Sequence, residues 1–178
     1  QFYQIKFSKE FFTHNTIILN LENSVEKIWN NLSKTLRKSI KKSDKEDLTF
    51  KVFNKKNNRE TLSDQMKIFK KMHYNIYGRQ TRLDGSWDSM LNSIIDGEAL
   101  LFSILKERDE ISFLYCGVYN KFCFGWSQAN LKKSEKDLSV RHFLEWSVIK
   151  YLKMNKYLFY EIGERFYEYK DFNPSKNT

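Results

Sequence analysis

The chain has 178 residues, of which 40% are hydrophobic and 16% aromatic, so it is long and apolar enough to bury a core and is not a disordered chain. Two cysteines exclude a disulfide-rich scaffold. The formal net charge of +9 favours an anionic partner, namely nucleic acid, a phosphate-bearing cofactor or an anionic membrane surface, although a lysine-rich surface that only aids solubility is equally consistent with it.

The first half of the chain is predicted to alternate strands and helices. Residues 16–21 (TIILNL) are β-branched and apolar and predict a strand. One helix is predicted from Ser24 onward, because apolar residues recur with the 3.6-residue helical period at Val25, Ile28, Trp29, Leu32, Leu36 and Ile40. The elements expected next are a strand at 48–53, a polar loop at 54–60, a helix at 61–77 with Met72 or His73 inward, a polar loop at 78–85 and a short helix at 86–95.

The second half is predicted to begin with a meander of three strands joined by connections of hairpin length. The elements expected there are strands at 98–106, 111–118 and 122–129, a polar loop at 130–136, a helix at 137–154 and a strand at 157–162. The order is therefore β-α-β-α-α-β-β-β-α-β, without an internal repeat or a linker. It predicts one α/β domain over residues 1–178.

Cys116 and Cys123 lie on either side of the second hairpin turn. If Tyr119 and Asn120 form a two-residue turn, the two cysteines face each other across the strands, but free thiols are expected in a reducing cytosol. Neither cysteine has a His or Cys neighbour at metal-ligand spacing, and no metal is expected. No apolar run approaches the roughly 20 residues of a membrane span and no signal peptide is recognised, so we expect a cytoplasmic protein with at most peripheral membrane contact.

Two segments carry a more specific pattern, WNNLSKTLRKSIKK at 29–42 and FLEWSVIK at 143–150, the second followed by YEIG at 160–163. Between them lie Tyr74–Tyr77 with Thr81-Arg82, and Gly125-Trp126-Ser127. In this order the motifs resemble those of the FemAB-like branch of the GCN5-related N-acetyltransferase (GNAT) superfamily, over about residues 16–165. The sequence departs from the family at Glu161, where Asp is usual, and at Glu164, where a second glycine is usual. The family also continues with a further strand, so the C-terminus is expected to be truncated or to complete the sheet differently.

The resemblance implies a mixed central sheet, flanked by helices, in which the strands at 122–129 and 157–162 diverge. The gap between them is expected to hold the pantetheine arm of acyl-CoA or an aminoacyl ester, next to the donor-binding candidates Trp126, Ser127, Gln128 and Arg141. A place in the core is the alternative for Trp126. The helix beginning at 137 is expected to direct its N-terminus at donor phosphates. The loop before it lacks the glycines of the acetyltransferase phosphate loop, and Lys132, Lys133 and Lys136 either supply charge in their place or form a solvated loop.

Acyl transfer to an amine needs a neutral amine, a polarised carbonyl and a route for the proton, and positioning alone can serve without a nucleophile. Glu161, near the end of a strand, is the expected general base if burial raises its pKa, and a residue in an ordinary ion pair otherwise. His142 is the second catalytic candidate, because it opens a helix near the expected mouth of the gap. A structural role is the alternative for His142.

The acceptor-binding candidates are Arg37, Lys41, Tyr77 and Arg82. Arg37 and Lys41 lie one helical turn apart and are expected to face an anionic acceptor, such as a sugar nucleotide or a lipid-linked precursor. The alternative is a plain basic helix face. Arg82 is expected either to serve the same acceptor pocket or to cap a loop.

The leading hypothesis from the sequence is an N-acyltransferase that moves an acyl group from acyl-CoA to an amine, such as an amino sugar or a cell-envelope precursor. Two alternatives stay open. One is a FemAB-type aminoacyltransferase that uses aminoacyl-tRNA. The other is a non-catalytic, basic module that binds RNA or a partner protein, although no known RNA-binding motif is present.

Overall fold

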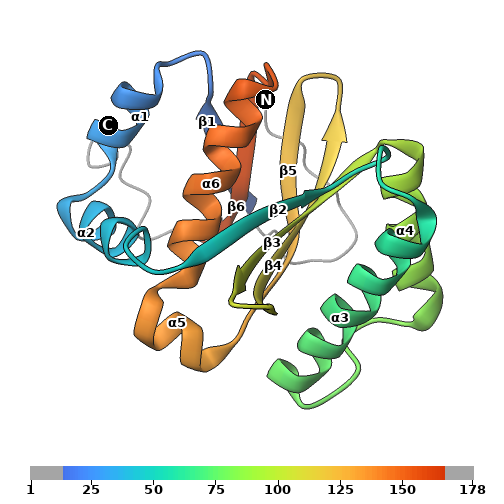
Figure 1. Cartoon of the computed structure of the whole chain (residues 1–178). Helices are drawn as coiled ribbons and strands as arrows, with labels where there is room; N and C mark the ends of the chain where they lie inside the picture. Colours follow the sequence, from blue (N-terminus) through green and yellow to red (C-terminus); the bar gives the residue numbers. More distant parts are fainter. Residues whose placement is uncertain (1–13, 167–178) are drawn as a thin grey trace, which may run out of the picture.

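The computed structural model describes residues 14–166, and this part of the chain forms six strands and six helices (Figure 1). The strands are β1 (His14–Asn20), β2 (Leu48–Phe53), β3 (Ala99–Lys106), β4 (Asp109–Tyr119), β5 (Phe122–Asn130) and β6 (Phe159–Phe166). The helices are α1 (Val25–Asn31), α2 (Lys34–Ser43), α3 (Arg59–Tyr77), α4 (Asp84–Asp96), α5 (Lys132–Leu138) and α6 (Val140–Met154). All six strands belong to one sheet in the order β1-β6-β5-β4-β3-β2. Only β5 and β6 pair in parallel, which confirms the predicted mixed α/β sheet.

The single helix predicted from Ser24 onward is wrong, because α1 and α2 are separate helices. Leu32 is extended, with ψ of 144°, and ends α1. The Ser33 hydroxyl then accepts a hydrogen bond from the Leu36 N–H and caps α2. A serine in this position favours a new helix start over continuation. The apolar period runs through the break, so periodicity alone could not reveal it.

The predicted loop at 130–136 is also wrong, because α5 occupies most of it. Ser139, in a left-handed conformation with φ of 50°, separates α5 from α6. The residues of α5 are almost all polar, so they have no apolar stripe that would mark a helix. The other predicted elements are confirmed, with bounds that differ by a few residues.

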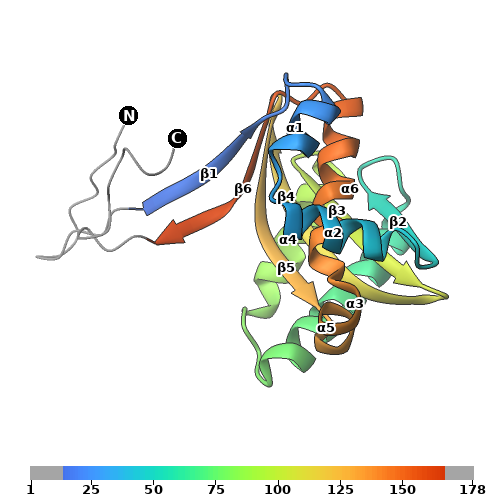
Figure 2. The same ribbon diagram turned by 90° about the vertical axis from the view of Figure 1, so that its left-hand side faces the viewer.

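The helices cover the two faces of the sheet (Figures 1 and 2). Leu100, Phe102 and Ile104 of β3 face a core shared with α1, α2 and α6, which we call the α6 face. The alternate residues Ala99 and Leu101 face a second core shared with α3 and α4, the α4 face. Because both faces are covered, the whole stretch 99–105 is buried. No helix within residues 14–166 is both long and apolar enough to cross a membrane.

The strands β5 and β6 pair over only three positions and then diverge. The pairs are Phe122 with Phe159, Cys123 with Tyr160 and Phe124 with Glu161. Beyond them β5 stays with β4, whereas β6 pairs with β1 in a two-stranded ribbon that leaves the rest of the sheet (Figure 2). The predicted divergence is therefore confirmed.

A bulge lies in β5 next to this divergence. Tyr115 of β4 is opposite Ser127 and Cys116 is opposite Gly125, which leaves Trp126 as an extra residue. The two-residue turn is Asn120-Lys121 and not Tyr119-Asn120, so Cys123 is opposite Val118 and the expectation that the cysteines face each other directly is wrong. Both cysteines are buried, free thiols.

Candidate active site

Three cavities lie around the divergence of β5 and β6. The serine cavity, of about 310 Å³, is lined by Arg82, Ser86, Ser89, Met90, Ser93, Tyr115, Trp126 and Ser127. The basic cavity, of about 610 Å³, is lined by Ile76, Tyr77, Gln128, Ala129, Asn130, Lys132, Glu135, Lys136 and Arg141. The apolar cavity, of about 300 Å³, is lined by Leu32, Leu36, Ile40, Arg141, His142, Glu145, Trp146, Ile149 and Ile162.

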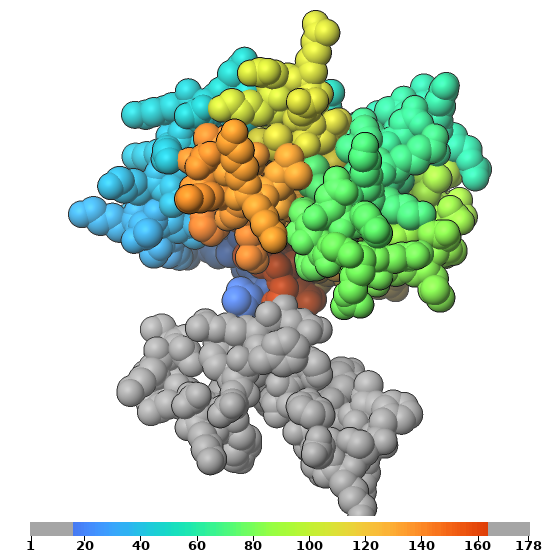
Figure 3. Space-filling model, turned by 90° about the horizontal axis from the view of Figure 1, so that it is seen from below, coloured from blue at the N-terminus to red at the C-terminus, as the bar shows by residue number. Residues whose placement is uncertain are grey.

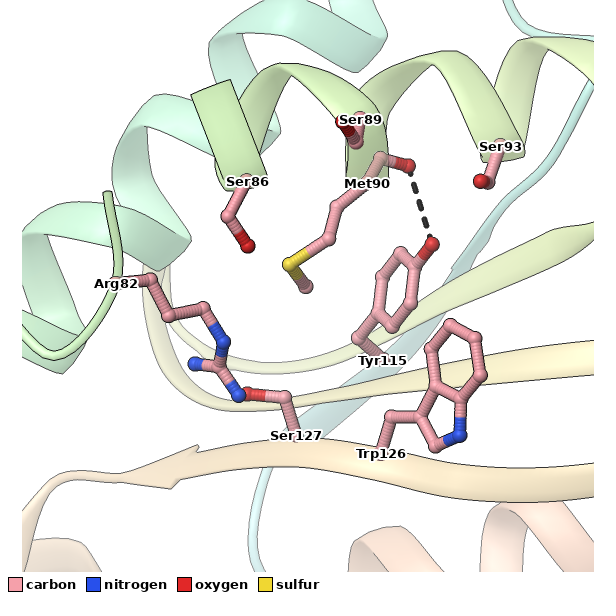
Figure 4. A pocket seen from close by; sticks show the side chains of 8 residues that line it. All are labelled: Arg82, Ser86, Ser89, Met90, Ser93, Tyr115, Trp126 and Ser127. Atoms are coloured by element: carbon pink, nitrogen blue, oxygen red, sulfur yellow. Dashed lines mark hydrogen bonds between the residues drawn. The ribbon is translucent and has the colours of Figure 1, made fainter. Parts of the chain in front are cut away.

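The serine cavity lies between α4 and the strands β4 and β5 (Figure 4). The bulge turns both Trp126 and Ser127 toward this cavity, although neighbouring residues of a regular strand point to opposite faces. Tyr115 forms the floor, where its hydroxyl donates to the Met90 carbonyl over 3.2 Å. The Trp126 ring stacks on Tyr115 with ring centres 6.1 Å apart, and it stays largely exposed. The cavity therefore has one aromatic wall and a wall of small hydroxyls.

A buried histidine lies directly behind the serine cavity. The Nε2 atom of His73, on α3, is 3.0 Å from the Ser127 hydroxyl, and its Nδ1 atom is 3.4 Å from the Thr81 hydroxyl. His73 and Ser127 are only 5% and 7% exposed. Burial, followed by the positive charge of Arg82, lowers the pKa of His73 from 6.5 to about 4. The imidazole is therefore neutral at pH 7 and has one acceptor nitrogen for a proton.

Arg82 places a fixed positive charge at one end of the serine cavity. Its guanidinium lies over the Trp87 ring, 5.4 Å from the ring centre, and in Figure 4 it points toward Ser127. Stacking on an aromatic face restrains the arginine while leaving its N–H groups free to bind an anion. The cavity can therefore bind a polar molecule that carries a carboxylate or phosphate.

The basic cavity lies where the end of β5 meets α5, α6 and the last turn of α3. Figure 3 shows the orange surface of α5 beside the green surface of α3. Lys132, Lys136 and Arg141 contribute three positive charges against the one negative charge of Glu135. The Glu135 carboxylate accepts a hydrogen bond from the Arg141 backbone N–H over 2.8 Å. An internal anion thus already occupies the first turn of α6, where a phosphate was expected to bind.

The apolar cavity lies on the α6 face. Its polar groups are Arg141, His142 and Glu145, and the Tyr160 hydroxyl donates to Glu145 Oε2 over 2.6 Å. Burial raises the pKa of Glu145 from 4.5 to about 7, although the hydrogen bond from Tyr160 and the charge of Arg141 both act to lower it. The buried Nδ1 atom of His142 makes no hydrogen bond.

The structure brings together most of the residues that the sequence nominated. Trp126, Ser127 and Arg82 line the serine cavity, although Arg82 was assigned to the acceptor and the other two to the donor. Tyr77, Gln128 and Arg141 line the basic cavity, and Arg141 and His142 line the apolar cavity.

Three nominated residues line none of these cavities. Arg37 donates to the Asn30 carbonyl over 2.8 Å, which joins α2 to the end of α1, and Lys41 is exposed on α2. Glu161 is half-buried at the last position where β6 pairs with β5.

Sequence reasoning missed His73 and Glu145. His73 has a weak signal, because it occupies a predicted inward position of α3 where a titratable side chain needs a partner. Glu145 lies inside a segment quoted only for its apolar residues, and its partner Tyr160 is on another element. Among residues 14–166, no group of three or more His, Cys, Asp or Glu side chains is arranged to hold a metal ion.

Comparison with solved structures identifies the fold. FemX matches with a TM-score of 0.70 and 14% identity over 97% of this chain and 58% of that one. The C-terminal domain of a proposed lysylphosphatidylglycerol synthetase from Agrobacterium fabrum matches with a TM-score of 0.64 and 14% identity over 87% of this chain and 48% of that one. L-PGS from Bacillus licheniformis matches with a TM-score of 0.61 and 13% identity over 91% of this chain and 49% of that one.

The chain spans about half the length of these solved structures. No protein-family model matches the sequence, and no curated protein matches it. These likenesses, at 13–14% identity, show that the chain shares the fold of FemX and of the two other structures, so the fold that the resemblance implied is confirmed.

Proposed function

We propose that the protein transfers an acyl group, most specifically an aminoacyl group, from an activated ester to an amine at the divergence of β5 and β6. The observation that carries the proposal is the three-residue pairing of these strands, with the serine cavity on the α4 face and the apolar cavity on the α6 face. Donor and acceptor can approach such a gap from opposite faces of the sheet. Bringing them together in this way supplies much of what direct transfer requires.

The serine cavity is proposed to bind the acceptor. Its nitrogen attacks the donor carbonyl carbon, the new C–N bond replaces the C–O bond to the carrier, and the carrier leaves as an alcohol. The amine must lose one proton in this step. Ser127 can take it while passing its own hydroxyl proton to the neutral Nε2 of His73. The protonated His73 then returns one proton through Ser127 to the carrier oxygen, so that the carrier leaves as an alcohol and no net proton is gained or lost. Glu161 at the divergence stays our alternative candidate for the base.

An aminoacyl-tRNA is the donor that we favour. There is no glycine between Gly125 and Gly163, so the chain lacks the loop that lets a backbone approach a pyrophosphate closely. The Glu135 carboxylate occupies the first turn of α6 and would repel a pyrophosphate there. The three cations of the basic cavity suit phosphates of a nucleic acid strand. The name of one structural neighbour, a lysylphosphatidylglycerol synthetase, also refers to a lysyl group joined to a lipid.

Acyl-CoA is the second candidate donor, and the size and charge of the basic cavity favour it independently of the missing glycines. For the acceptor we propose an amine that also carries an anionic group, such as an amino sugar derivative of the cell envelope, because Arg82 supplies a positive charge in the serine cavity.

The test is a transfer assay with a panel of amines that includes glucosamine 6-phosphate and lysine-containing peptides. One arm supplies total tRNA charged with radiolabelled amino acids, with and without RNase, and the other supplies radiolabelled acetyl-CoA. We expect RNase-sensitive labelling of an amine in the first arm. Labelling only from acetyl-CoA would identify acyl-CoA as the donor in place of aminoacyl-tRNA. Salt-sensitive RNA binding with no labelled amine in either arm would indicate a binding module without transferase activity.

A further inference from the structure

The apolar cavity begins one residue beyond the last pair between β5 and β6. Ile162, which forms part of its wall, directly follows Glu161, the last residue of β6 that pairs with β5. A cavity in this position is suited to the part of a donor that is attached to its carbonyl carbon. The acceptor, in the serine cavity, lies on the other face of the sheet.

The walls of the cavity are apolar and held in place by packing. Leu36 and Ile40 come from α2, and Trp146 and Ile149 come from α6. The Trp146 ring is itself packed against Trp29, with ring centres 4.8 Å apart. At about 300 Å³ the cavity is at the small end of ligand sites. Its size therefore favours a compact group over a long chain, and its apolar walls favour an apolar side chain on that group.

Two polar groups in this cavity have unused capacity to accept hydrogen bonds. Glu145 is bonded by the Tyr160 hydroxyl through Oε2, and the buried Nδ1 of His142 has no partner. A buried polar atom without a partner costs free energy. In the tautomer of His142 that carries its proton on Nε2, the Nδ1 atom is an acceptor, and a ligand that donates an N–H group to it gains free energy. A carboxylate and a ring nitrogen beside apolar walls are complementary to an ammonium group next to an apolar side chain, with Arg141 as the one cation among the described residues of the lining.

We propose that the apolar cavity binds the transferred group and that this group is an α-amino acid with an apolar side chain. The ammonium donates to Glu145 and His142, and the side chain packs against Leu36, Ile40 and Trp146. This inference rests on the proposed transferase function and narrows its donor to an apolar aminoacyl ester.

The direct test is binding of L-leucinamide, a stand-in for a leucyl ester, followed by NMR chemical-shift titration. The matched probe is 4-methylpentanamide, which has the same side chain without the α-amino group. We expect L-leucinamide to bind at least about tenfold more tightly than this analogue and than L-aspartamide. Glu145→Gln should abolish the preference for the amino compound. Equal binding of the two amides by the native protein would overturn the proposal.

A second variant locates the binding. Leu36→Trp fills the cavity and should abolish L-leucinamide binding, whereas Met154→Trp, at an exposed position of α6, adds the same side chain outside the cavity and should leave binding unchanged. Retained binding by Leu36→Trp, with far-ultraviolet circular dichroism unchanged, would place the amide elsewhere and refute the inference.

These measurements separate this inference from the proposed reaction. If L-leucinamide binds as expected but no charged tRNA donates to any amine, the reaction is wrong and the cavity assignment stands. If tRNA charged with aspartate donates as efficiently as tRNA charged with leucine, the reaction stands and the cavity assignment is wrong.

Discussion

The Ser127 hydroxyl lies 3.0 Å from Nε2 of the buried, neutral His73, and Ser127 itself lines the serine cavity. This pair connects the cavity to the α3–α4 loop through Thr81. If it removes the proton of the acceptor amine, both residues act in the chemical step.

We therefore expect Ser127→Ala and His73→Gln each to lower kcat by about 100-fold, with KM changed less than threefold. Steady-state kinetics with the amine found in the transfer assay measures both constants. The control is Ser103→Ala, since Ser103 is a fully buried strand serine whose hydroxyl has no partner, so kcat should be unchanged. Equal kcat for Ser127→Ala and the native protein would move the role of base to Glu161.

The pKa of His73 also predicts how stability depends on pH. It falls from 6.5 in the unfolded chain to about 4 in the folded one, so between these values the unfolded chain binds a proton that the folded protein does not. The contribution is fully present above pH 6.5 and is lost as the pH falls to about 4, for a total of about 3 kcal/mol.

His73→Gln cannot titrate, so its deficit in unfolding free energy relative to the native protein should shrink by about 3 kcal/mol between pH 7 and pH 4. Urea denaturation at several pH values measures the difference. A deficit independent of pH would show that His73 is protonated in the folded protein at its ordinary pKa.

Arg82 should affect both binding and the titration of His73. Arg82→Gln removes the positive charge that lines the serine cavity. If the acceptor binds there as proposed, we expect its KM to rise about tenfold, the effect of losing one charge-assisted hydrogen bond of about 1.4 kcal/mol. Because the positive charge of Arg82 lowers the pKa of His73, the same variant should raise that pKa, as followed by NMR titration of the imidazole. Arg79→Gln, in the same loop but exposed, should change neither quantity.

Replacement by alanine should lower the unfolding free energy at one glycine of the hairpin but not at another. A Cβ at Gly117 would clash with the Phe124 ring, which itself packs against Trp126, whereas a Cβ at Gly125 meets no atom closer than 3.5 Å. Gly117→Ala should therefore lower the unfolding free energy by about 1–2 kcal/mol, and Gly125→Ala should not lower it. Thermal denaturation of the two variants checks this, and equal melting temperatures would show that the Phe124 ring moves freely.

Much of the fold could be predicted because the sequence shows the helical recurrence of apolar residues and, in strands, the alternation of apolar and polar residues. What could not be predicted depends on single residues that interrupt a pattern. Ser33 starts a new helix inside a continuous apolar stripe, and Ser139 ends α5, which has no stripe.

The candidate site could be predicted only in part, for the same reason. Strict alternation would place Ser127 on the opposite face of the sheet from Trp126, and only the bulge brings both to the serine cavity. The partnership of His73 with Ser127, and that of Glu145 with Tyr160, each join distant elements. No local pattern in the sequence encodes such pairs.

The bulge makes Trp126 supernumerary in the sheet. Cys116 pairs with Gly125 and Tyr115 pairs with Ser127, so the pairing of β4 with β5 is regular on both sides of Trp126. Deleting Trp126 would keep Ser127 opposite Tyr115, whereas deleting one residue from 127–129 would move each following residue of β5 to the other face of the sheet. A residue can therefore be gained or lost at this one position, and the shape of the serine cavity can change there while the register of the core strands is kept.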